Sequence, residues 1–152
     1  MVMDLKKYKL GFDISGLALF LIVMLPNFIW FAVPAPNDIL RAESVTPAID
    51  MIGSICQVLF VAALCVMINK KRKKLRLSPM LISSIAFIIL YFLGWILYYV
   101  GVSSSVVIIL LTVPPCLAFI LFALDRKNII AVVPAVCFMI CHLVYGTVNF
   151  IV

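Results

Sequence analysis

The chain has 152 residues, of which 66% are hydrophobic and 12% are charged. A soluble domain is nearer half apolar and a quarter charged, so this composition excludes an ordinary soluble domain and indicates an integral membrane protein. The net charge of +6 does not indicate nucleic-acid binding, because nearly all of the basic residues flank apolar stretches.

Five apolar stretches are long enough to cross a membrane as helices, which takes about 20 residues each. In chain order they cover residues 14–33, 49–68, 80–100, 106–124 and 129–151. The first is longer than the ~7–15 apolar residues of a signal peptide, and Pro36 follows the point where cleavage would fall, so we expect it to be retained. Little chain is left over, so we expect residues 1–152 to form a single all-α transmembrane domain.

The basic residues are distributed unevenly between the two sides of this five-span pattern. Eleven of the twelve lie on one side, namely Lys6, Lys7, Lys9, Lys70, Lys71, Arg72, Lys73, Lys74, Arg76, Arg126 and Lys127. Arg41 alone lies in a connection on the other side. Because basic residues stay on the cytoplasmic side during insertion, the sequence predicts a plasma-membrane protein with its N-terminus inside and its C-terminus outside.

The second connection carries the densest charge in the chain. We interpret it as a topology anchor that also contacts anionic lipid headgroups, each basic residue contributing ~1 kcal/mol near such a surface. The residues expected to meet lipid are Lys70, Lys71, Arg72, Lys73, Lys74 and Arg76. Docking of an acidic cytoplasmic partner is the alternative, which we favour less because the positive-inside rule alone would produce this run.

Polar side chains recur at helical spacing in two of the predicted spans. In the second span, Asp50 and Gln57 follow i, i+7 and share one face with the serine between them. In the fifth span, His142, Tyr145 and Asn149 follow i, i+3, i+7 and again share one face. With the predicted orientation, both faces lie between the membrane midplane and the outer surface.

Two further spans bring similar groups to a similar depth. Tyr91 and Trp95 lie on one face of the third span, and Asn27 lies in the first span one turn before Trp30. Polar groups in hydrocarbon usually face the bundle interior or a water-filled cavity. The sequence therefore predicts an outward-facing ligand pocket lined by Asn27, Asp50, Gln57, Tyr91, Trp95, His142, Tyr145 and Asn149. Interhelical hydrogen bonding and interfacial aromatic anchoring explain the same pattern equally well.

The first external connection, residues 34–47, is bounded by prolines and is the one charged external segment. It contains Asp38, Arg41 and Glu43, and Asp50 follows soon after. One interpretation is a cap folded over the bundle. The other is a short surface loop with a local ion pair, which would contribute only ~0–1 kcal/mol.

Sequence signatures of catalysis are absent: the chain has no HExxH, no GxSxG, no glycine-rich phosphate loop and no paired intramembrane aspartates. The five cysteines lie within predicted spans, and we expect reduced, structural thiols. Cys141 and His142 are adjacent, but helical geometry turns their side chains about 100° apart. We therefore predict no catalytic residue, no metal site and no cofactor.

Three segments resemble small multi-pass membrane proteins of unknown function from Gram-positive bacteria: residues 25–44, 94–99 and 141–146. The resemblance implies a bacterial cell-membrane protein and brings no activity with it. We expect a protein that binds or transports a small molecule. The alternatives are an accessory or immunity-type protein that acts through helix contacts with a partner, and, less favoured, a membrane enzyme of unrecognised type.

Overall fold

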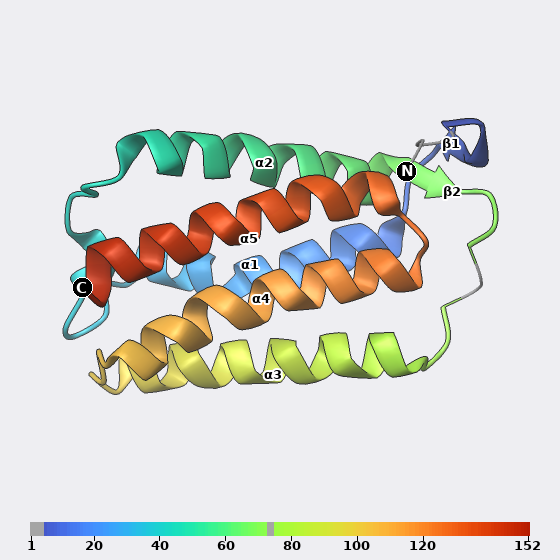
Figure 1. The fold of residues 1–152 in the computed structure, drawn as a ribbon. Coiled ribbons are helices and arrows are strands. Elements are labelled where there is room, and N and C mark those ends of the chain that lie inside the picture. Colours follow the sequence, from blue (N-terminus) through green and yellow to red (C-terminus); the bar gives the residue numbers. More distant parts are fainter. Residues whose placement is uncertain (1–4, 73–74) are drawn as a thin grey trace.

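The computed structural model describes residues 5–72 and 75–152, in which five long helices lie side by side (Figure 1). The helices have 19 to 22 residues, and each is long and apolar enough to cross a membrane. They are α1 (Ile14–Ala32), α2 (Pro47–Val66), α3 (Pro79–Tyr99), α4 (Ser105–Asp125) and α5 (Ile129–Phe150). The expectation of a helical protein with five candidate spans is confirmed, and five such helices are compatible with a multi-pass membrane protein.

Capping residues explain where three of the helices begin. Asp13 accepts a hydrogen bond from Ser15 N at the start of α1, over 3.1 Å. Ser78 and Asn128 accept from the third residue of α3 and α5, over 3.1 and 3.3 Å. Short polar side chains at these positions satisfy backbone N–H groups that the first turn leaves without partners.

The helices form a closed ring in the order α1, α2, α5, α4, α3. Extensive contacts join α2 to α5, α5 to α4 and α4 to α3, whereas α1 closes the ring against α2 and α3 with far fewer contacts. Glycines permit the close approaches: an added Cβ at Gly94 would lie 2.9 Å from Leu110 Cβ, and at Gly146 2.8 Å from Thr112 Cγ2. Because α1 makes the fewest contacts with its neighbours, it is the most loosely held wall of the ring.

One end of the bundle departs from the all-helical expectation. Strand β1 (Tyr8–Leu10) follows a 3₁₀ turn, η1 (Leu5–Lys7), and pairs antiparallel with β2 (Met67–Asn69). Helix α2 ends at Val66, close to the approximate end of the second predicted span at about residue 68. Backbone hydrogen bonds from Gly11 N to Val66 O, 3.0 Å, and from Asp13 N to Cys65 O, 2.7 Å, satisfy the last carbonyls of α2. The N-terminal segment thus supplies the N–H donors that the next turn of a longer helix would otherwise have provided.

We call this end the basic end. A buried carboxylate, that of Asp13, links the segments that meet there. Asp13 is 6% exposed and accepts hydrogen bonds from Arg72 and, over 3.2 Å, from Arg126. Burial acts to raise the pKa of Asp13, but the hydrogen bond and charge of Arg126, with the charge of Arg72, hold it below its usual value. Arg72 therefore binds within the fold, and its contact with lipid stays a prediction. Lys73 and Lys74, also expected at lipid, lie outside the described residues.

Candidate functional site

A partly open cavity of about 410 Å³ lies between the helices of the ring. Its lining takes side chains from all five helices and one, Leu40, from the segment that joins α1 to α2. The cavity lies toward the end of the bundle opposite the basic end, because its lining includes Trp30 near the end of α1 and Asp50 in the first turn of α2. We call this the cap end.

Seven of the eight residues expected at a pocket line this one cavity: Asn27, Asp50, Gln57, Tyr91, Trp95, His142 and Tyr145. The eighth, Asn149, does not line it. Its Oδ1 accepts a hydrogen bond from Val45 N, 2.7 Å, and its Nδ2 donates to the Thr46 hydroxyl, 2.8 Å. The amide is used to fasten the start of α2 to the end of α5. That the seven residues bind a ligand stays a prediction.

The polar side of the cavity has hydrogen-bonding capacity that the fold leaves unused. Within the described residues, neither the Gln57 side chain nor the His142 ring makes a hydrogen bond; His142 stacks on Phe138 and Tyr145, with ring centroids 5.0 and 6.2 Å apart. Asp50 Oδ1 accepts one hydrogen bond, from the Thr46 hydroxyl, over 3.1 Å. Gln57 and His142 thus do not act as interhelical hydrogen-bonding groups in this structure.

The opposite side is an aromatic wall built mainly on α3. Trp95 packs edge-on against Tyr91 and Tyr98, with centroids 6.4 and 5.8 Å apart, and Asn27 Nδ2 donates to the Tyr91 hydroxyl over 2.6 Å. Trp95 is 6% exposed, and its Nε1 interacts with the Tyr91 hydroxyl without reaching full hydrogen-bonding geometry, so it has no well-formed hydrogen bond in the described part of the chain. An unsatisfied buried donor costs about 1–3 kcal/mol, a cost that a bound acceptor would remove.

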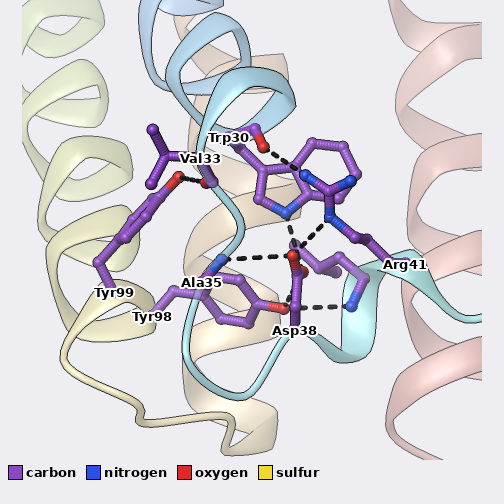
Figure 2. A network of polar contacts seen from close by, with 8 residues as sticks. Trp30, Val33, Ala35, Asp38, Arg41, Tyr98 and Tyr99 are labelled. Carbon is purple, nitrogen blue, oxygen red and sulfur yellow. Dashed lines mark hydrogen bonds and ion pairs between the residues drawn. The ribbon is translucent and has the colours of Figure 1, made fainter.

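Residues 33–46, which we call the cap, fold over the cap end and are held by one carboxylate (Figure 2). Asp38 accepts hydrogen bonds from Trp30 Nε1 at 2.8 Å, the Tyr98 hydroxyl at 2.9 Å and Ala35 N at 3.3 Å. It also forms an ion pair with Arg41, whose Nε lies 2.7 Å from Oδ2. The cap is therefore a structured element tied to two helices, and an isolated surface ion pair does not describe it.

Further contacts fasten the cap along its length. The Tyr98 hydroxyl accepts from Leu40 N, 3.1 Å, in the 3₁₀ turn η2 (Ile39–Arg41), and the Tyr99 hydroxyl donates to Val33 O over 2.6 Å. Asn37 Nδ2 donates to Gly101 O over 3.0 Å, which joins the cap to the turn after α3. These bonds place Leu40 over the cavity.

Sequence reasoning missed the central role of Asp38 and the place of Trp30 in the lining. Interfacial anchoring is one of the two interpretations that the sequence leaves open for its aromatic residues, and in the structure Trp30 lines the cavity and donates to Asp38. The available signal was an acid and an arginine three residues apart between prolines, directly after a tryptophan at a helix end. That signal identifies a folded loop, but not the partner tyrosine on α3.

The chemistry of the lining does not include a metal centre among the described residues, where no group of three or more His, Cys, Asp or Glu side chains converges. All five cysteines are free thiols; Cys137 is exposed and the other four are buried. No family model, curated protein or solved structure matches this chain. The function is therefore argued from the cavity and its cap.

Proposed function

We propose that this protein binds or transports a small organic molecule in the cavity beneath the cap, as a multi-pass protein of the plasma membrane. One observation carries the proposal. The cavity combines an aromatic wall with polar groups, at Gln57, His142 and Trp95, whose hydrogen-bonding atoms the described fold does not use. Apolar walls with a few convergent polar groups are typical of small-molecule sites, and about 410 Å³ lies within their usual size range.

The alternatives have less support. A protein that acts through helix contacts with a partner would place its distinctive polar groups on the outer faces of the bundle, whereas these face inward. A membrane enzyme would need a poised pair of groups, but Asp50 and His142, both in the lining, form neither a hydrogen bond nor an ion pair within the described residues. Binding is the function that this arrangement favours.

Tryptophan fluorescence tests the proposal directly, because the chain has two tryptophans, Trp30 and Trp95, and both line the cavity. We expect at least one compound from a panel of amines, carboxylates, alcohols and aromatic metabolites to change the fluorescence of the full-length protein saturably in lipid nanodiscs. The same compound should stabilise the fold against heat, by ~2.7 kcal/mol at 100 times its Kd.

The control is a variant that carries Trp30→Phe, Trp95→Phe and Val58→Trp. Val58 is 68% exposed on α2, so its replacement reports only on the surroundings of the bundle and should not respond. A panel without any saturable response from the native tryptophans, combined with a stoichiometric membrane partner in mild purification, would instead support the accessory function.

The proposed orientation places the basic end in the cytoplasm, and it predicts which positions a membrane-impermeant maleimide reaches. In a cysteine-free background, Ser44→Cys in the cap and Ser104→Cys at the start of α4 should label in intact cells. Lys71→Cys at the basic end should label only after permeabilisation, because basic segments remain inside during insertion. Labelling of Lys71→Cys in intact cells would reverse the topology.

A further inference from the structure

We infer that the cavity selects a small organic cation, a protonated amine or a quaternary ammonium, held between the Asp50 carboxylate and the aromatic wall. The inference rests on the proposed function and adds the chemical class of the ligand. It stands on three features of the lining: its charge, its aromatic groups and its one buried donor without a partner.

The charged groups of the lining are all of one sign. Asp50 is the one carboxylate among the lining residues, and no lysine or arginine lines the cavity. Within the described chain, Asp50 forms no ion pair, and its hydrogen bond from the Thr46 hydroxyl, 3.1 Å, is a contact with a neutral group. The His142 ring, which also lines the cavity, does not hydrogen-bond to Asp50 within the described residues. A bound cation would give the Asp50 carboxylate an ion-pair partner that the described protein does not supply.

The aromatic wall suits the same ligand. Trp30, Trp95 and Tyr91 line the cavity on this wall, Tyr145 lines it on the polar side, and the faces of their rings carry the negative part of the quadrupole, which attracts cations. The structure already contains one such contact at the cap end, where the Arg41 guanidinium lies 4.9 Å from the centre of the Trp30 ring. A neutral ligand would gain from the apolar area of the wall, but a cation would gain from the area and from the quadrupole.

The buried donor adds a requirement for an acceptor on the ligand. Trp95 Nε1 makes no well-formed hydrogen bond in the described part of the protein, its interaction with the Tyr91 hydroxyl falling short of that geometry, and Trp95 lies one turn from the end of α3. Asp50 lies in the first turn of α2, at the same end of the bundle. A cation that also carries an oxygen atom would satisfy the carboxylate and the indole N–H together.

Three molecules of nearly the same shape separate charge from size and hydrogen bonding. Choline carries a quaternary ammonium and a hydroxyl group, 3,3-dimethylbutan-1-ol has carbon in place of the charged nitrogen, and 3,3-dimethylbutanoate is an anion. Titrated into full-length protein in nanodiscs at constant ionic strength, with native tryptophan fluorescence as the signal, choline should bind at least ~10-fold more tightly than the alcohol, as a desolvated charge contact predicts. The anion should bind most weakly.

Asp50→Asn keeps an oxygen that accepts from Thr46 and removes the charge. It should weaken choline binding at least ~10-fold and leave the alcohol unaffected. Glu43→Gln removes one negative charge from the exposed surface of the cap, away from the lining, and should change neither.

Equal binding of choline and the alcohol, or an unchanged preference for choline in Asp50→Asn, would overturn the cation inference while leaving a binding protein. A protein that ignores choline yet responds to a neutral or anionic member of the broader panel would do the same. If no compound changes the tryptophan fluorescence, the proposed binding function is itself wrong.

Discussion

Replacing Asp38 with alanine should unfold the cap and lower the free energy of unfolding by about 1–3 kcal/mol, the usual cost of leaving largely buried donors without their acceptor. The carboxylate side chain is 11% exposed and accepts from Trp30, Tyr98, Ala35 and Arg41. Alanine would leave these donors without their acceptor. Thermal unfolding in detergent, followed by tryptophan fluorescence, measures the loss.

Glu43 provides the matched control, since it is an exposed acid in the same cap. Glu43→Ala should change stability by no more than about 0.5 kcal/mol, as is usual for surface substitutions. Asp38→Asn keeps an acceptor but not the charge, and it should fall between the two. If Asp38→Ala melts at the same temperature as Glu43→Ala, the cap is not held by this carboxylate.

Lowering the pH should also destabilise the cap. Burial acts to raise the pKa of Asp38, but hydrogen bonds from Trp30, Arg41 and Tyr98 hold it below its usual value. A carboxyl group with a lowered folded-state pKa contributes stability that is complete above its unfolded pKa, about 3.9, and is lost as pH falls through the folded pKa. The pKa of Asp13 at the basic end is lowered in the same way, so acid also destabilises that end. The contribution of Asp38 is therefore measured by comparing the free energy of unfolding of the native protein with that of Asp38→Ala as the pH falls below about 4.

Local patterns allowed the helices and most of the lining to be predicted. A segment in hydrocarbon must satisfy its own backbone hydrogen bonds, so a long apolar run specifies a helix with little help from the rest of the chain. Helical spacing likewise identifies the residues of one face, which is why Asp50 with Gln57, and His142 with Tyr145, meet at the cavity. Which faces turn toward one another was inferred from the cost of exposing polar groups to lipid.

Long-range pairing accounts for what the sequence did not reveal. Strand β2 exists because Lys9 pairs with Ile68, and the cap is ordered because Asp38 meets Tyr98, 60 residues away. No periodicity within one segment encodes such contacts. Asn149 shares a helical face with His142 but does not line the cavity, because its amide binds Val45 and Thr46.

The largest effect on ligand binding is expected from Gln57→Met and His142→Phe, which keep much of the volume of each side chain and remove its polar atoms. Each should weaken binding of the best panel compound about 10- to 100-fold, because a polar group of the bound ligand would lose its partner in a desolvated site. Titration of the native tryptophans measures this, with thermal unfolding of the same samples alongside.

Stability should move little in these two variants, and this separates a binding site from interhelical hydrogen bonding. Neither side chain hydrogen-bonds within the described protein, so removing its polar atoms breaks no bond of the unliganded fold. Residues that join helices would instead lose ~0.6–2 kcal/mol and keep the ligand. Val58→Met, on the exposed face of α2, controls for the added methionine and should alter neither measurement. A variant that binds normally but unfolds more easily would show that Gln57 and His142 serve the bundle, and that the ligand, if one binds, contacts other parts of the lining.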